Sequence, residues 1–165
     1  MRKVLDKLID QKADVDERTM QMLVLGLEYL RELVDEHMRV ETVEKKKELS
    51  AEACASQKVH GLVNACSLIL GDAADIRKVA EGYVGAQFIE SMDDALDAIC
   101  ELINVANGKF ARSFTKEGED EDLEPPFYRH EASLIKADEI YAARVHLCGA
   151  TVYFCIAYGV GIAAL

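Results

Sequence analysis

The sequence lacks the short motifs of several common enzyme classes. It has no glycine-rich phosphate-binding loop, and no serine or cysteine lies in a nucleophile motif. Its five cysteines include no closely spaced pair of the metal-binding or redox type, so we interpret them as small, reduced, mostly buried hydrophobic residues. The four histidines are scattered without helical pairing, which gives a metal site built from them little support.

Positive charge is also scarce. The chain has 19 Lys and Arg against 30 Asp and Glu, a net charge of −11 at pH 7. Nucleic acids and anionic membranes would be repelled, so neither is an expected partner. Charges occur throughout residues 1–10, which predicts no signal peptide and a cytoplasmic location. The long uncharged run 147–165 contains three glycines and two tyrosines, and is better interpreted as a turn and a buried strand than as a membrane span.

A single domain is expected, because half of the 165 residues are hydrophobic and can bury one core. We place this domain at residues 16–165, after an N-terminal extension over 1–15 that forms a short helix. Hydrophobic periodicity and turn residues predict the remaining elements. Helices are expected over about 17–37, 74–83 and 91–114, and strands over 49–56 and 59–70, joined at Gln57-Lys58.

The last third of the chain is predicted to form strands. Lysines 45–47 mark an exposed strand edge or turn, and residues 116–124 form an acidic, solvated loop. Alternation around 141–147 predicts a strand, with a turn at Gly149-Ala150 and a second strand over 151–158. The fold class is therefore α+β, with long helices packed on a mostly antiparallel sheet.

The predicted helix over 91–114 carries the most informative pattern. Its core stripe consists of Leu96, Ile99, Ile103, Ala106 and Phe110. At about 100° per residue, the opposite side carries Asp94, Asp97, Glu101, Asn104, Gly108 and Arg112. Ser91 is placed as the N-cap, with Asp94 in the first turn. Because a glycine inside a helix costs about 1 kcal/mol relative to alanine, Gly108 suggests a backbone that another surface approaches.

The sequence Glu101-Leu-x-Asn104-x-x-x-Gly108 resembles the signature helix of the CheC/CheX chemotaxis phosphatases, which hydrolyse the phosphoryl group on phosphorylated response regulators. The order of elements over about 17–165 also follows that family. A single signature is more similar to the CheX branch, because the first long helix has Arg31 where a second asparagine would be needed. Two details depart from the family pattern: Lys109 follows the glycine, and Asn107 adds a second amide.

The resemblance implies a mechanism and a partner. Asn104 would orient the water that attacks the aspartyl-phosphate of a CheY-type regulator, and Glu101 would pair with the regulator's conserved lysine. Asp97 and Gly108 would face the partner, with Gly108 permitting close approach. The Mg²⁺ would be held by the regulator, so no cofactor or metal of the chain's own is expected. The resemblance also implies a homodimer, formed through a strand edge that the sequence does not specify.

Two other functions stay open at this level. A domain of the same fold could bind a signalling partner or act as a scaffold in two-component signalling without turnover. A metal or thiol redox protein is the third hypothesis, and it predicts metal bound on purification. Dephosphorylation of a phosphorylated regulator separates the first two hypotheses, and elemental analysis tests the third.

Overall fold

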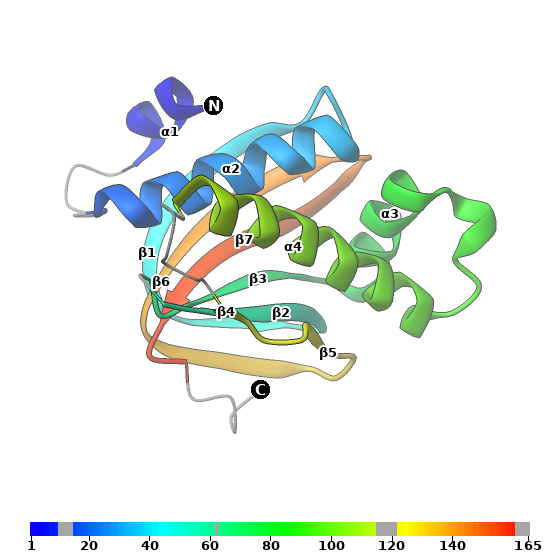
Figure 1. Ribbon diagram of the computed structural model, residues 1–165. Helices are drawn as coiled ribbons and strands as arrows, with labels where there is room; N and C mark the ends of the chain where they lie inside the picture. The colour runs from blue at the N-terminus through cyan, green and yellow to red at the C-terminus, as the bar shows by residue number, and fades with distance from the viewer. Residues whose placement is uncertain (10–14, 62, 115–121, 161–165) are drawn as a thin grey trace.

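The computed structural model describes residues 1–9, 15–61, 63–114 and 122–160 (Figure 1). In this part of the chain the helices are α1 (Arg2–Leu8), α2 (Glu17–Leu33), α3 (Ala73–Val84), the short 3-10 helix η1 (Ala86–Phe88) and α4 (Met92–Phe114). The strands are β1 (Arg39–Ala51), β2 (Ala53–His60), β3 (Ala65–Gly71), β4 (Asp122–Leu123), β5 (Phe127–Arg129), β6 (Ser133–Leu147) and β7 (Ala150–Tyr158).

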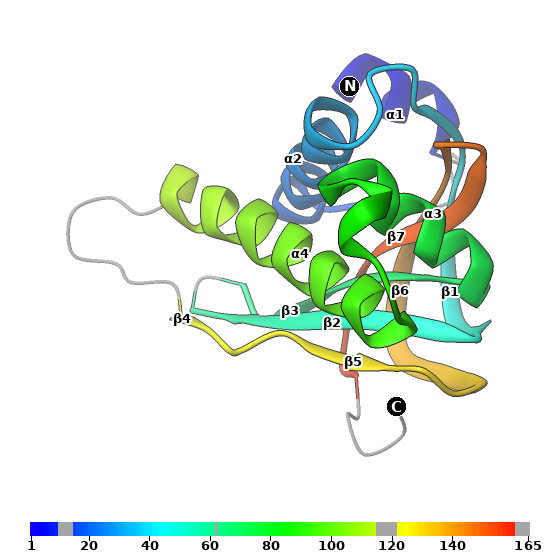
Figure 2. The ribbon, with the colours of Figure 1, turned by 90° about the vertical axis from the view of Figure 1, so that its right-hand side faces the viewer.

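All the strands belong to one antiparallel sheet. Its order is β1-β6-β7-β3-β2-β4, and β5 pairs with β2 beside β4. Figure 1 shows α2 and α4 lying next to each other across one face of this sheet, with α3 beside the N-terminal end of α4. The turned view in Figure 2 shows the same arrangement, with α1 near the β1 edge and β5 below α4. The α+β fold class is therefore confirmed, with helices on one side of an antiparallel sheet.

Strand alternation produces a hydrophobic core on each face of the sheet. On the face covered by the helices, Leu23 and Leu27 of α2 and Leu96, Ile99 and Phe110 of α4 are almost completely buried. A second cluster lies on the other face and contains Cys54, Cys66, Leu68, Ile135 and Cys155, among others. This face is closed without a helix, because β6 curves so that its first residues run beneath β2 and β3 (Figure 1).

Most of the predicted elements are confirmed. The short helix in the extension is α1, and the predicted helices over 74–83 and 91–114 match α3 and α4. All five members of the predicted core stripe of α4 are buried. The lysines at 45–47 lie within the edge strand β1, the first of the two possibilities that the sequence left open. Of the predicted loop over 116–124, residues 116–121 lie outside the described residues, as does the end of the uncharged run. Residues 122–123 are not loop, because they form the short strand β4, which pairs with β2.

The first long helix is shorter than predicted, because it ends at Leu33 and not at His37. Asp35 lies two residues after this end, and its carboxylate accepts hydrogen bonds from the backbone N–H groups of His37 and Cys148, at 2.9 and 2.7 Å. A side chain that captures backbone donors in this way competes with helical hydrogen bonding. The prediction missed this because the partner at Cys148 is distant in the sequence.

The predicted strands over 49–56 and 59–70 have the wrong bounds, because residues 49–51 end β1 and the next two strands span 53–60 and 65–71. The predicted junction at Gln57-Lys58 is therefore wrong. Both residues lie in the middle of β2, and the chain reverses only after His60. Gln57 and Lys58 are two adjacent polar residues between hydrophobic stretches. Gln57 nevertheless faces the helices and is 2% exposed, because side chains of α4 satisfy its amide. Strand pairing thus overrides a local turn signal.

The last hairpin turn is displaced by one residue from its predicted place. Leu147 pairs with Ala150, so the turn residues are Cys148 and Gly149. Both have positive φ, 51° and 68°, as a type I′ turn requires. The second strand, predicted over 151–158, begins at Ala150. No helix among the described residues is both long enough and apolar enough to cross a membrane.

Two helical glycines should respond in opposite ways to alanine. A Cβ on Gly26 of α2 would overlap the buried ring of Phe154 on β7, whereas a Cβ on Gly108 of α4 meets no atom within 4 Å. We expect Gly26→Ala to lower the free energy of unfolding by about 1–3 kcal/mol through overpacking. Gly108→Ala should raise it by about 0.5–1 kcal/mol. Urea denaturation of both variants checks this, and a stabilised Gly26→Ala would contradict the packing of α2 on β7.

Candidate functional site

One face of α4 brings the predicted site residues together. Asp97 and Glu101 are exposed, while Asn104 and Gly108 are partly exposed. At about 100° per residue, the four lie within an arc of about 60° on the helix. The face lies between two tyrosines: burial and then the Glu101 charge raise the pKa of Tyr83 on α3. Burial and then the charges of Asp93 and Asp97 raise the pKa of Tyr128 on β5.

Asn104 is held from the protein side by Gln57. The Gln57 Nε2 donates to Asn104 Oδ1 at 2.8 Å and to the backbone carbonyl of Glu124 at 2.9 Å. No group within the described ranges pairs with the Nδ2 of Asn104. The asparagine is therefore attached to the sheet through its oxygen.

The hydrogen bonding continues below α4. Asn107, one turn after Asn104 and 4% exposed, donates its Nδ2 to Gln57 Oε1 at 2.9 Å. Its Oδ1 accepts a hydrogen bond from the Ser67 hydroxyl at 2.8 Å. Gln57 and Ser67 are direct cross-strand partners on β2 and β3, with both side chains beneath the helix. We call Ser67, Asn107, Gln57 and Asn104 the polar chain.

Of these four residues the sequence predicts only Asn104 as part of the site; Gln57, Asn107 and Ser67 are buried beneath it. In the sequence Asn107 stands out only as a second amide, and the pattern around Gln57 predicts a turn. A signal was present, because Gln57 stands in an alternating row with Ala53, Ala55 and Val59, which all face the helices. A polar residue in such a row needs a hydrogen-bonding partner, and Asn104 and Asn107 supply it.

Asp94 belongs to the start of the helix and not to the site. Its carboxylate accepts from the backbone N–H and hydroxyl of Ser91, at 2.7 and 2.8 Å, and from the N–H of Glu90 at 3.1 Å. The Ser91 hydroxyl in turn accepts from the Asp94 N–H at 3.1 Å. This reciprocal capping confirms the predicted helix start and fixes the register of the face that follows. The ammonium group of Lys109 lies 4.3 Å from the centre of the Tyr29 ring on α2, a cation–π contact between the two helices.

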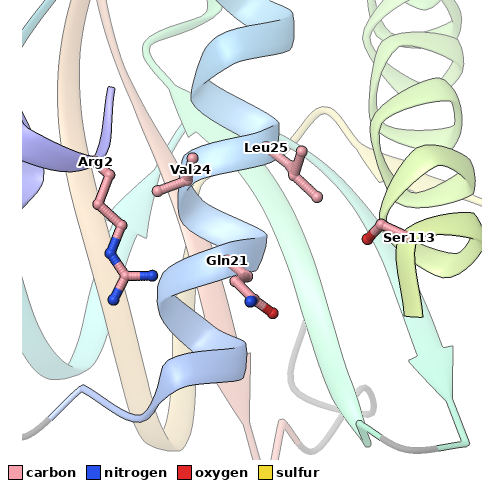
Figure 3. Close-up of a pocket in the computed structure, with 5 residues that line it drawn as sticks. All are labelled: Arg2, Gln21, Val24, Leu25 and Ser113. Carbon is pink, nitrogen blue, oxygen red and sulfur yellow. The ribbon is translucent and has the colours of Figure 1, made fainter.

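Two hollows lie near opposite ends of α4. One of about 370 Å³ lies where α4 begins, between Asp93 and residues 127–131 around β5, and so adjoins the acidic end of the face. Phe127, at its edge, is 50% exposed. The other, of about 290 Å³, lies where α4 ends, between Gln21 and Leu25 of α2 and Ser113 (Figure 3). It shares no residue with the polar chain.

The cysteines fit the predicted interpretation. All five are unpaired; four are buried and Cys148 is partly exposed. Burial raises the pKa of Cys54 and of Cys66 to about 12, so both thiols stay protonated at neutral pH. In the part of the chain that the structure describes, no three His, Cys, Asp or Glu side chains are grouped so that they could hold a metal ion.

Comparisons with known proteins bear on the fold. No protein-family model and no curated protein sequence matches the chain. Among solved structures, it is similar to the chemotaxis protein CheX of Desulfovibrio desulfuricans, with a TM-score of 0.70 and 11% identity over 86% of this chain and 98% of that one. The chain has a CheX-like fold. CheX of Vibrio vulnificus gives 0.69, with 15% identity over 86% of this chain and 99% of that chain.

A third similar structure includes a partner. It is the complex of CheX and CheY with BeF₃ and Mg²⁺ from Borrelia burgdorferi, with a TM-score of 0.55 and 18% identity over 82% of this chain and 94% of that chain. The CheX-like fold predicted from Glu101, Asn104, Gly108 and the order of elements is therefore confirmed. At these identities the likeness describes the fold, and the role of the α4 face has to be argued from its residues.

A pH titration should report on the segment that anchors the polar chain. His60 Nε2 lies 2.7 Å from Glu124 Oε1, and this hydrogen bond raises the pKa of His60 above its ordinary value of 6.5. Protonated His60 therefore favours the folded state. Its contribution is fully present below pH 6.5 and is lost as the pH rises through the higher folded pKa.

The measurement is an NMR titration of the His60 ring in the wild type and in Glu124→Gln. We expect the His60 pKa to fall in the variant and the pH dependence of its unfolding to weaken over the same range. The Glu124→Gln variant keeps the backbone carbonyl that binds Gln57, so the hydrogen bonds of the polar chain should be unaffected by the substitution. An unchanged His60 pKa would contradict the pairing.

Proposed function

We propose that the chain is a phosphatase that hydrolyses the aspartyl-phosphate of a phosphorylated CheY-type response regulator. The observation that carries the proposal is the α4 face, where the carboxylate of Glu101 and the carboxamide of Asn104 stand one turn apart on an accessible surface. The CheX-like fold adds support, since one similar structure is a complex of CheX with CheY. The Nδ2 of Asn104, which pairs with no described group, is a further argument for a ligand there.

In the proposed reaction the chain contributes mainly the positioning of the attacking water. Phosphoryl transfer passes through a loose, in-line transition state, so catalysis is mostly positioning and electrostatics. The Mg²⁺ and a lysine beside the phosphoryl group belong to the regulator in this mechanism, and the chain supplies no cofactor. Asn104 orients the attacking water, because a carboxamide donates and accepts hydrogen bonds without adding negative charge near phosphate.

The other residues of the face act in docking. Glu101 pairs with the regulator's lysine and so fixes the register between the two proteins. Asp97, one turn earlier, adds a second negative charge to the face and would help to steer the regulator's lysine toward it. Gly108 has open space where a side chain would begin, so a partner's loop can approach the helix backbone. A cytoplasmic location and a homodimer complete the proposal.

Asn104→Ala tests turnover. With CheY-type regulators of the same organism phosphorylated by acetyl phosphate, the wild type should accelerate dephosphorylation and the variant should lose about 100-fold of that acceleration. The lower limit is the regulator's own hydrolysis rate. Release of phosphate at saturating chain concentration is the measurement. Equal rates for variant and wild type would remove Asn104 from the mechanism.

The same assay separates catalysis from binding alone. If the wild type binds the regulator without accelerating hydrolysis, the chain is a binding or scaffold domain of the same fold. Affinity for the regulator carrying beryllofluoride, a stable phosphoryl analogue, is measured in parallel. Asn104→Ala should leave this affinity nearly unchanged, because its proposed contribution lies in the transition state.

Glu101→Gln should mainly weaken binding of the regulator, whereas Asn104→Ala mainly lowers the rate of hydrolysis. The substitution keeps the shape of the side chain and removes its charge, so a charge-assisted contact worth about 1.5–3 kcal/mol weakens. We expect the dissociation constant for the beryllofluoride-bearing regulator to rise at least about tenfold at low salt, and less at high salt. Titration calorimetry at two salt concentrations checks this. Gly108→Val, whose Cβ meets no atom within 4 Å, should also weaken binding but without the salt dependence.

A further inference from the structure

The backbone carbonyl of Glu124 fixes the direction of every hydrogen bond in the polar chain. A carbonyl oxygen only accepts, so the Gln57 amide must turn its Nε2 toward it, where the two lie 2.9 Å apart. An amide nitrogen carries two hydrogens, and the second points at Asn104, 2.8 Å away. Asn104 must therefore present its oxygen to Gln57. A Gln57 amide turned the other way would place its oxygen against the Glu124 carbonyl and against Oδ1 of Asn104, so acceptors would face each other at both contacts.

The far end of the polar chain agrees with this direction. With Nε2 of Gln57 toward Glu124, its Oε1 faces Asn107 and accepts a hydrogen bond from the Asn107 Nδ2 at 2.9 Å. The Oδ1 of Asn107 is then turned to Ser67, whose hydroxyl donates at 2.8 Å. At each of these contacts a donor meets an acceptor, and every buried side-chain nitrogen and oxygen of the polar chain has a partner within the described structure.

We propose that Gln57 is a positioning residue, which fixes the carboxamide of Asn104 with Oδ1 toward the protein and Nδ2 outward. Asparagine χ2 is otherwise broad and nearly two-fold, so an unheld amide would sample both orientations. The fixed amide offers two N–H donors and the second lone pair of Oδ1 to a bound ligand. Such a set suits an oxyanion and a water lying side by side, the pair of groups present in phosphoryl hydrolysis.

The kinetic consequence rests on the proposed phosphatase function, whereas the ordering of Asn104 does not. A catalytic amide that is already oriented loses less rotational freedom when the transition state forms. Gln57 is 2% exposed and lies under α4, so it cannot touch the regulator itself. Removal of the Gln57 amide should therefore lower the rate of hydrolysis, whereas docking through Glu101 should stay unchanged.

Gln57→Met is the main variant, and Ser67→Ala is its matched control. Methionine has nearly the same length and fills the space without donors. Ser67→Ala breaks the far link of the polar chain and keeps both hydrogen bonds of Gln57 Nε2. The first readout is the ¹H–¹⁵N heteronuclear NOE of the Asn104 side-chain amide, with the backbone of α4 as reference. It should be high in the wild type and in Ser67→Ala, and low in Gln57→Met.

The second readout is kinetic. We expect Gln57→Met to dephosphorylate the regulator, phosphorylated beforehand with acetyl phosphate, about 10- to 100-fold more slowly than the wild type does. Its affinity for the beryllofluoride-bearing regulator should stay unchanged, and Ser67→Ala should keep most of the activity. If Gln57→Met does not fold, Gln57→Glu takes its place. Glutamate keeps the shape of the side chain, but its carboxylate oxygens, which only accept, face the Glu124 carbonyl and Asn104. The Asn104 carboxamide should therefore rotate to present its Nδ2 to residue 57, and the rate of hydrolysis should fall.

The outcomes separate the two ideas. An Asn104 amide that stays as rigid in Gln57→Met as in the wild type overturns the positioning role, whatever the activity. A mobile amide with an undiminished hydrolysis rate overturns it as well. If the wild type does not accelerate hydrolysis but its rigid Asn104 becomes mobile in Gln57→Met, the proposed function fails and the positioning of the amide stands.

Discussion

The packing of α4 on β2 and β3 is the contact on which the rest of the structure depends. It buries the hydrophobic stripe of the helix, and it thereby determines that Asp97, Glu101, Asn104 and Gly108 face outward. The same contact contains the polar chain, an unusual feature for the centre of a core. A hydrogen bond contributes only about 0.5–1.5 kcal/mol net, while a buried group left without its partner costs about 1–3 kcal/mol. Because of that asymmetry, the polar chain disfavours other registers of α4 more than it strengthens the correct one.

This constraint explains why the candidate site is precise although it lies on a surface. Ser91 and Asp94 fix where the helix starts, and the hydrophobic stripe fixes its rotation. Gln57 then ties the one side chain whose orientation matters most for the proposed chemistry. Among the residues that the structure describes, no hydrogen bond or ion pair holds Glu101, so it can adapt to a partner, as a side chain in an ion pair between two proteins needs to do. The face thus combines an ordered amide with a more adaptable carboxylate.

The sequence carried enough information for the fold class and for the exposed half of the site. Helical phase alone placed Glu101, Asn104 and Gly108 together, because the stripe of α4 is long and regular. It could not supply the buried half. Gln57 is 47 residues from Asn104 in the chain, and Glu124 enters through a backbone carbonyl that no side-chain pattern reveals. The misplaced turn at Gln57-Lys58 has the same cause, since the partners that make a buried glutamine acceptable are known only once the helix lies on the sheet.

The first long helix, α2, shows how few residues separate a site from an ordinary surface. In α2, Glu28 and Arg31 are exposed and have the same spacing as Glu101 and Asn104. A guanidinium has no acceptor, however, so Arg31 cannot accept a hydrogen bond from a water, and its charge would oppose a regulator's lysine and Mg²⁺. Its Nε is instead turned to the carbonyl of Glu36 at 3.1 Å. Under the proposed mechanism α2 therefore offers no second site, and the difference between the two helices lies in one side chain and in the polar chain beneath α4.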